Sequence, residues 1–376
     1  MKQISEKEKI AWIRLARSEN VGPITFRNLL AQFGVPSEAL KQINAMAKRG
    51  GRNGSVHIAS EKEAVDEVQK AAAMKAQLIL SCEERYPARL QAIEDKPPVL
   101  TVKGHLSLLK EKAVAIVGTR NASLNGKRIA SGLAKELAQA GVVVVSGLAR
   151  GVDTAAHEGV LSLNETPAMT IAVVGTGLDV VYPAENEKLA EKIGLSALIV
   201  SEFPFGVKPL PSNFPKRNRI ISGLSQGVVV VEAQARSGSL ITARLALEQG
   251  REVFAVPGSP VDPRSEGTNR LLKQGAFLVE NAQDILNEIG YEREFEFSDV
   301  IHENEFEEEP LQIDEKMLDE VRQTVLKNLN VQTVPIDSLI EECALPTHLV
   351  NVVLTELELA GRIQRFAGNK VAMLPE

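Results

Sequence analysis

Cysteine is almost absent from this chain: Cys82 and Cys343 are the only two in 376 residues, and neither lies in a Cys-x-x-Cys pair or near a histidine at metal-ligand spacing. A disulfide framework and a zinc site are therefore not expected, and a reducing compartment is the natural environment. Long apolar runs are missing too, and residues 1–15 lack the apolar middle of a signal peptide. We expect a soluble, cytoplasmic protein with no membrane partner.

Two common phosphate-binding motifs are missing as well. Gly118 and the later Gly126-Lys127-Arg128 fail the P-loop pattern, because the spacing is wrong and Arg128 replaces the magnesium-binding Ser/Thr. The Gly-Thr-Gly at 175–177 has no third glycine two residues on, so it is not a GxGxxG motif. We predict neither ATP hydrolysis nor NAD chemistry, no cofactor and no metal.

Catalytic constellations are equally hard to find, since no Ser-His-Asp or Cys-His arrangement is evident. Asp153 and His157 lie four residues apart near the start of a predicted helix. Capping and packing explain such a pair more simply than catalysis. The chain is therefore predicted not to be an enzyme.

The net charge of −6 is unevenly distributed. Residues 292–310 hold nine acidic residues against Arg293 alone, which gives this segment −8 and leaves +2 for the rest of the chain. The total charge therefore reflects one acidic linker and does not exclude a nucleic-acid partner.

The chain is too long for one hydrophobic core, so two or three domains are expected. Between Ala113 and Ile289, apolar β-rich runs alternate with helix-length segments, as in a doubly wound, mostly parallel α/β sheet of the Rossmann-like class. The predicted divisions are a helical domain at 1–75, this Rossmann-like domain at 76–290, an acidic linker at 291–312 and a winged-helix domain at 313–376.

The two flanking domains carry motifs of their own. The turn at Gly22-Pro23 resembles a helix-hairpin-helix, which can offer amide groups to a DNA phosphate, although a protein-contact or purely structural module is at least as reasonable. In the winged helix, the third helix (347–360) has no Lys or Arg and carries Glu356 and Glu358. This charge suits DNA poorly, so we predict a partner-binding or regulatory module.

The predicted strands of the central domain end in glycine-containing turns that also hold arginines and aromatic residues. In open α/β sheets, ligands bind beyond the carboxyl ends of the strands, where backbone amides approach an anion. Guanidinium groups suit phosphodiester oxygens and aromatic rings give bases a stacking face. Phe203 and Phe205 are more simply core residues, and Arg236 and Arg244 are as easily structural as functional.

At these turns the chain resembles the DprA/Smf family. The resemblance rests on GTR at 118–120, SGLARGVDTAAH at 146–157, GTGLDVVYPAEN at 175–186, FPKRNRIISGLS at 214–225, EAQARSGSLITARLALEQGR at 232–251 and FAVPG at 254–258. It implies a Rossmann-like core that binds single-stranded DNA, forms a homodimer and helps load RecA recombinase in natural transformation, without known catalysis. Some relatives have a lysine where this chain has Ala184, so one basic contact differs.

The resemblance also assigns residues. The predicted DNA contacts are Gly118, Arg120, Ser146, Gly147, Arg150, Gly175, Gly177, Phe214, Lys216, Arg217 and Arg219. Backbone amides are expected to act at Ser146 and at the glycines, and Leu271 and Leu272 are expected at the dimer interface.

Three alternatives remain open from the sequence. Arg217 and Arg219 could form structural ion pairs with Glu202 or Glu232 instead of binding DNA. The chain could be a nucleotide-hydrolysing enzyme of the LOG-like group, although that group's PGGxGT motif is absent. It could also be a regulator that acts on duplex DNA through its winged helix.

Overall fold

The computed structural model describes residues 4–290, 315–343, 345–366 and 368–374. The chain forms two compact units, one made of Met1–Asp66 with Arg293–Glu376 and the other of Glu67–Glu292. The predicted acidic linker at 291–312 lies outside the described residues.

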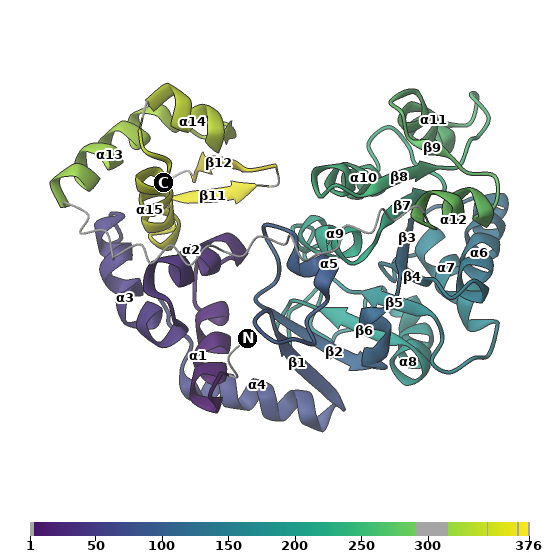
Figure 1. Cartoon of the computed structure of the whole chain (residues 1–376), viewed down its shortest axis with the longest axis horizontal. Helices are drawn as coiled ribbons and strands as arrows, with labels where there is room; N and C mark the ends of the chain where they lie inside the picture. Colours follow the sequence, from purple (N-terminus) through teal and green to yellow (C-terminus); the bar gives the residue numbers. More distant parts are fainter. Residues whose placement is uncertain (1–3, 291–314, 344, 367, 375–376) are drawn as a thin grey trace. The chain divides into compact units, whose positions relative to one another are not determined.

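The larger unit is built on a nine-stranded sheet with the order β1-β2-β6-β5-β4-β3-β7-β8-β9 (Figure 1). Strands β3 to β9 pair in parallel, while β2 pairs antiparallel with both β1 and β6. The strands are β1 Ala76–Leu80, β2 Val99–Gly104, β3 Ala113–Val117, β4 Val143–Ser146, β5 Thr170–Val173, β6 Leu198–Ser201, β7 Gly227–Val230, β8 Glu252–Ala255 and β9 Phe277–Leu278. The predicted doubly wound, mostly parallel sheet is confirmed.

Helices follow most of these strands along the chain. They are α4 Glu61–Ala73, α5 Ala88–Gln91, α6 Leu124–Gln139, α7 Val152–Leu161, α8 Glu187–Ser196, α9 Asn213–Leu224, α10 Gly238–Glu248, α11 Glu266–Lys273 and α12 Ala282–Gly290, with short 3-10 turns at Leu106–Lys110, Ala184–Asn186 and Pro263–Ser265. Helix α6 packs beside α7, and α9 packs beside α10.

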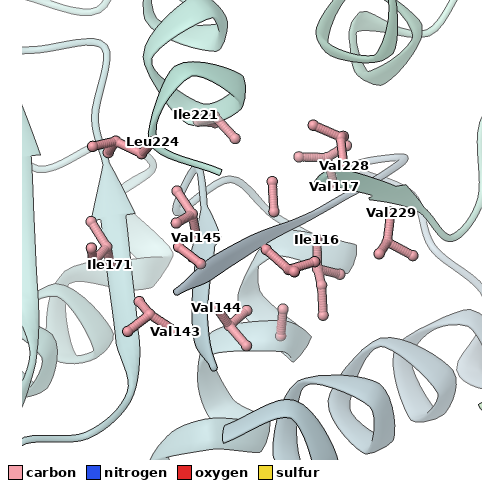
Figure 2. Close-up of a cluster of buried hydrophobic side chains, with 14 of the residues drawn as sticks. Ile116, Val117, Val143, Val144, Val145, Ile171, Ile221, Leu224, Val228 and Val229 are labelled. Carbon is pink, nitrogen blue, oxygen red and sulfur yellow. The ribbon is translucent and has the colours of Figure 1, made fainter. Parts of the chain in front are cut away.

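The central strands are apolar on both faces because helices cover both. Ile116, Val144 and Val228, on three neighbouring strands, are each fully buried. Ile221 and Leu224 of α9 join the same cluster (Figure 2). Burying each such side chain contributes about 1.5–3 kcal/mol, so this cluster is what fixes the strand ends in place.

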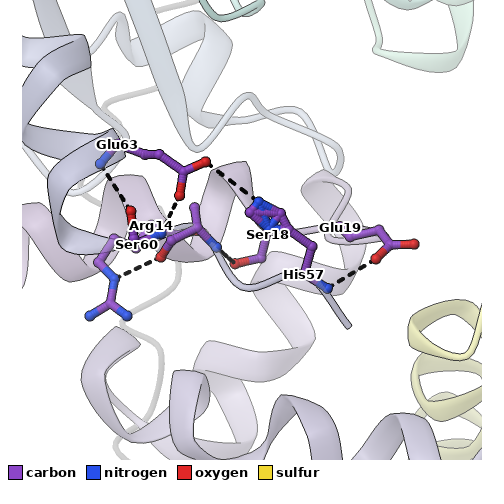
Figure 3. A network of polar contacts seen from close by, with 7 residues as sticks. Arg14, Ser18, Glu19, His57, Ser60 and Glu63 are labelled. Atoms are coloured by element: carbon purple, nitrogen blue, oxygen red, sulfur yellow. Dashed lines mark hydrogen bonds and ion pairs between the residues drawn. The ribbon is translucent and has the colours of Figure 1, made fainter. Parts of the chain in front are cut away.

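The N-terminal part of the smaller unit consists of α1 Glu6–Arg17, α2 Pro23–Phe33 and α3 Pro36–Arg49. Trp12 of α1 and Phe26 of α2 pack with ring centroids 5.0 Å apart. The segment that follows α3 is tied back to α1: Arg14 Nε donates to the Ala59 carbonyl at 2.8 Å and Glu19 accepts from the His57 amide at 3.0 Å (Figure 3).

The C-terminal part consists of α13 Glu315–Asn328, α14 Ile336–Cys343 and α15 Thr347–Leu359 with a small sheet of β10 Val334–Pro335, β11 Ile363–Phe366 and β12 Lys370–Met373, in the order β10-β12-β11. Val325, Leu339 and Val353 are fully buried in its core. The predicted winged helix is confirmed, with β10 as a third strand that the sequence did not indicate.

Candidate nucleic-acid interface

A pocket lies beyond the carboxyl ends of β3, β4 and β5, which are neighbours in the sheet. Because parallel strands end at the same edge, their loops converge there, and α9 packs against the same three strands. The lining residues are Arg120, Gly147, Ala149, Arg150, Gly175, Thr176, Tyr182, Pro183, Phe214 and Arg217. The structure thus brings six of the predicted contact residues together from four separate segments.

The loop after β3 presents Arg120 from a backbone that is fixed on both sides. Thr119 donates its amide to the Glu232 carbonyl at 2.7 Å, and Ser123 donates its amide and hydroxyl to the Glu232 carboxylate at 2.9 and 2.6 Å. Ser123 also caps α6 by accepting from the Gly126 amide. Arg120 is therefore exposed on a loop whose backbone is held, which reduces the entropy lost when it binds an anion.

Arg217 of α9 is buried, with 4% of its surface exposed, although it is a cation. Its guanidinium lies over Gly147, where an added Cβ would be only 1.5 Å from Nη1. Its Nε is buried and has no hydrogen-bond partner within the described ranges. Burial lowers the pKa of Arg217 to about 10; nearby Asp153 raises this pKa and nearby Arg120 lowers it further. Because a pKa of about 10 is well above neutral pH, the side chain stays charged.

Asp153 holds the loop on which Arg217 rests. Its Oδ2 accepts the Gly147 amide at 3.1 Å and the Ala149 amide at 3.4 Å. Burial raises the pKa of Asp153 to about 6, against the lowering effect of Arg217 and of the two amides. A carboxylate at this place offsets part of the positive charge of the pocket from beneath while it shapes the loop.

Two aromatic rings complete the pocket. The Arg120 guanidinium lies 5.0 Å from the centroid of the Phe214 ring, and that ring lies 5.6 Å from the Tyr182 ring at an interplanar angle of 47°. Gly175 lies beside the Phe214 ring, where a Cβ would be in ordinary contact at 3.4 Å. Tyr182 is exposed, so one aromatic face beside two arginines is open to solvent.

Several predicted contacts are placed differently. Arg219 is buried in an ion pair with Glu202 and lies 3.4 Å from Asp95, which favours the alternative role the sequence left open. It faces away from Arg217 because two residues on a helix are about 200° apart. Glu232, the other suggested partner, accepts from Ser123. Among the described ion pairs, it pairs with neither Arg217 nor Arg219. Lys216 is exposed on α9 outside the pocket lining. Arg150 does line the pocket and also lies 3.7 Å from Glu185.

The backbone donors also need correction. The Gly147 amide is engaged by Asp153 and the Gly177 amide by the Val207 carbonyl, while the Ser146 hydroxyl donates to the Ile116 carbonyl. Gly118 has a packing role, because a Cβ would lie 2.5 Å from the Val152 side chain. These groups shape the loops, and the positive charge comes from side chains.

The predicted dimer residues are also not equivalent. Leu271 is buried in the core of its own sheet and Leu272 packs against that core. Buried in this way, Leu271 cannot contribute to a partner surface without disturbing α11. The apolar side chains exposed nearby are Phe277 and Leu278 of the edge strand β9.

Sequence reasoning missed the roles of Tyr182, which lines the pocket, and of Asp153, which holds the loop that lines it. Asp153 was assigned to capping, but the N-cap of α7 is Gly151, so the carboxylate was free for another role. Tyr182 lies within the motif at 175–186 but was not among the predicted contacts. A tyrosine followed by proline in the loop after β5 was the available signal, because it places a ring at the same sheet edge as Arg120.

His157 is fully buried and its Nδ1 lies 2.8 Å from the Thr170 hydroxyl. Burial lowers its pKa to about 3, with Arg217 adding to the effect, so the ring is neutral. Within the described ranges, no cluster of three or more His, Cys, Asp or Glu residues could hold a metal. None of the described helices combines the length and apolar character needed to cross a bilayer.

The fold and the site together define the class of this protein. It has a Rossmann-like sheet with an arginine-lined pocket at its strand ends, and a helix-hairpin-helix module and a winged helix flank this sheet in the chain. The sequence model described as DNA recombination-mediator protein A matches residues 77–290, and models of a DprA-like N-terminal HHH domain and a DprA winged helix domain match 6–70 and 308–369. The chain belongs to the DprA/Smf family.

Comparison with individual relatives agrees with this assignment. The chain is 42% identical to Protein Smf of Escherichia coli over 297 residues, covering 79% of this chain and 77% of that protein. It is 49% identical to DNA processing protein DprA of Streptococcus pneumoniae over 210 residues, covering 55% and 72%.

Two solved structures extend the comparison. The crystal structure of DprA from Streptococcus pneumoniae superposes with a TM-score of 0.62 at 37% identity, covering 76% of this chain and 99% of that one. A structure of DprA from Helicobacter pylori, solved to describe its single-stranded DNA binding mode, gives a TM-score of 0.52 at 34% identity, with coverage of 57% and 95%.

Proposed function

We propose that the chain binds single-stranded DNA without sequence specificity across the pocket at the ends of β3, β4 and β5. One observation supports this most: Arg217 is a buried cation whose Nε has no partner in the described part of the chain, and it lines the pocket with the exposed Arg120. Burying a charge costs several kcal/mol unless it is compensated, and a phosphate oxygen compensates it.

The pocket chemistry favours a single strand over a duplex. The Tyr182 and Phe214 rings lie beside the two arginines, and unpaired bases can stack on an aromatic face while their phosphates meet guanidinium groups. Stacking is worth about 1–3 kcal/mol per base and does not depend strongly on which base is present. Sequence-independent binding follows from this combination.

We infer that the site binds without catalysis. Asp153 accepts two amides of its own loop, and His157 is neutral and bonded to Thr170. Both side chains thus have structural partners. Incubating the protein with nucleoside monophosphates tests the enzymatic alternative, and release of free base would overturn this inference.

Arg120→Ala tests the proposed site. Its loss removes one phosphate contact, so we expect weaker binding to oligo-dT and to mixed sequences alike. The slope of log K against log salt should fall in magnitude by about 0.7, the value for one phosphate on a single strand. Fluorescence anisotropy at several salt concentrations measures both quantities.

Arg244→Ala is the matched control. Arg244 is exposed on α10, where it lies 3.5 Å from Glu248, and it does not line the pocket. This variant should leave the salt slope unchanged. Equal losses in the two variants would mean that general charge, and not the pocket, attracts the DNA.

The finer function that the family resemblance implies is transfer of the bound strand to RecA recombinase by a cytoplasmic dimer during natural transformation. It is tested by following RecA filament growth on single-stranded DNA with and without the protein, comparing wild type with Arg120→Ala. An effect on RecA that survives the loss of DNA binding would contradict a handover that begins at this pocket.

A further inference from the structure

The outer face of helix α15 is covered by the N-terminal helices of the same chain. Helix α15 packs against both α2 and α3 (Figure 1). Leu349, Val353 and Leu357 of the same helix belong to the winged-helix core. In DNA-reading winged helices, the third helix is the one that enters the major groove. Here that helix is enclosed on two sides by protein.

Two glutamates on α15 carry the polar part of this contact. Glu356 is fully buried and binds Arg49 of α3 at 2.6 Å and Arg322 of α13 at 2.7 Å. One carboxylate thus joins the N-terminal helices to the winged helix with two charge-assisted bonds. A buried carboxylate is tolerated only when it is paired in this way, so the pairing selects one partner surface.

Glu358 makes the second connection. It accepts from the Thr25 hydroxyl of α2 and from Arg365 Nε of β11 at 3.1 Å. Thr25 lies in the first turn of α2, directly after Gly22-Pro23, the turn that a helix-hairpin-helix would offer to DNA. The carboxylate therefore lies against the part of α2 that would have to approach a phosphate.

The backbones also approach closely along this contact. A Cβ on Gly50 would lie 2.1 Å from the Glu356 carbonyl oxygen, so only glycine fits there. Asn28 donates to the Thr355 hydroxyl at 3.1 Å and Asn20 donates to the Leu359 carbonyl at 3.2 Å. Complementarity of charge, hydrogen bonds and shape extends over the length of the contact.

We propose that α15 is a docking helix whose partner is the chain's own α2 and α3, with Glu356 and Glu358 as its specificity residues, and that it does not read duplex DNA. Docking against α2 and α3 explains why α15 has no Lys or Arg, the feature that first suggested a partner-binding module. The proposal is independent of the single-strand site in the larger unit.

Arg49→Glu tests the docking contact in the full-length protein. It places a second carboxylate against the buried Glu356 and leaves the Arg322 pair within the winged helix intact. By hydrogen exchange with mass spectrometry, we expect amides of α2 and α15 to exchange at least tenfold faster, while the larger unit is unchanged. Lys48→Glu, the same change of charge at the neighbouring exposed position, should have no such effect. Equal exchange in both variants would overturn the docking contact.

A disulfide lock tests whether α15 also serves DNA. Asn28→Cys with Thr355→Cys, in a chain carrying Cys82→Ser and Cys343→Ser, should form an intramolecular disulfide with oxidised glutathione, seen by intact mass. Pairing Asn28→Cys with Thr347→Cys, eight residues earlier on α15 and about 12 Å away, should not. A cross-link between two chains would contradict docking within one chain.

The locked protein is then compared with its reduced form for binding to labelled duplex DNA and to oligo-dT. We expect oxidation to change neither affinity by more than twofold. If duplex affinity falls severalfold on oxidation and returns with reductant while oligo-dT binding is constant, α15 or α2 contacts DNA when free and the proposal is wrong.

Discussion

At the scale of single residues, the pocket depends on Arg217, a cation whose burial costs free energy of desolvation. Arg217 remains charged despite its burial, and Asp153 beneath the loop offsets only part of the cost. Arg120 lies nearby and lowers the pKa of Arg217 further. Two like charges held close together bind an anion strongly, because the anion relieves their repulsion as well as the desolvation of each.

Asp153→Asn should change how stability depends on pH. The folded-state pKa of Asp153 is about 6 against an ordinary 3.8, so the folded chain holds this proton more tightly and stability falls as pH rises from about 4 to 6. His157, with a folded-state pKa of about 3 against 6.5, acts in the opposite sense, since stability is lost as pH falls below 6.5. Between about pH 4 and 6, the contributions of Asp153 and His157 to the free energy of unfolding therefore change with pH in opposite directions.

In Asp153→Asn, the effect of His157 on the free energy of unfolding is therefore no longer offset by Asp153. On acidification from pH 6 to 4, the variant should lose about 2 kcal/mol more free energy of unfolding than wild type, because Asp153 is half-protonated near each end of this range in one of the two states. Urea unfolding at several pH values measures this. Asp66→Asn, the same change at an exposed position, should track wild type. Parallel curves for Asp153→Asn and wild type would contradict the assigned pKa shift.

The sequence could predict which segments form the site but not which side chain of α9 faces it. Lys216, Arg217 and Arg219 lie within four consecutive positions, and their place on the helix surface depends on how α9 packs against β3, β4 and β5. Arg217 faces the pocket and Arg219 faces Glu202. That choice is made by tertiary packing, which a single sequence does not display.

At the scale of elements, the loop between β4 and α7 and the helix α9 fit together through Gly147. Strands were predictable here because runs such as residues 113–117 are apolar on both faces and short. The role of the loop glycine was not, because its amide was expected to face a ligand and instead faces Asp153. The sequence does not distinguish a glycine whose backbone amide binds a ligand from a glycine that makes room for a neighbouring side chain.

Gly147→Ala should weaken DNA binding through Arg217. The added methyl group would lie 1.5 Å from Nη1 and 2.4 Å from Cζ, so the guanidinium must leave its place over the loop. Loss of one charge-assisted contact is worth about 1.5–3 kcal/mol, which corresponds to at least a tenfold rise in Kd for oligo-dT.

Gly132→Ala is the control for that substitution. Gly132 lies in the middle of α6 with open space around its Cβ position, so alanine should raise stability by about 0.4–1 kcal/mol and leave DNA affinity unchanged. Thermal unfolding and anisotropy titrations separate the two effects. If Gly147→Ala binds as wild type does, Arg217 is not held in place by this loop.

At the scale of the whole molecule, self-association depends on which apolar side chains remain outside. Leu271 is 8% exposed, whereas Phe277 and Leu278 of β9 are 38% and 50% exposed at one edge of the sheet. An exposed apolar edge strand is a ready surface for pairing with a second copy. The sequence predicted a dimer contact at Leu271 and Leu272 but could not tell a core leucine from a surface one.

We propose that the β9 edge carries the predicted dimer contact. Leu278→Lys should then shift the protein from dimer toward monomer without unfolding it. Light scattering coupled to size-exclusion chromatography at several protein concentrations measures the mass, and circular dichroism checks the fold. Leu271→Lys should instead lower thermal stability, because it buries an ammonium group in the core. A Leu278→Lys protein whose mass matches wild type at every concentration would exclude the β9 edge as the dimer contact.

The close approach at Gly50 has a consequence for genetics. Gly50 has no side chain and no charge, yet any side chain there would meet the Glu356 carbonyl and push the first and last modules of the chain apart. Loss-of-function alleles should therefore accumulate at a site that looks inert in the printed sequence. Their suppressors should be found some three hundred positions away, in the helix on the other side of that gap.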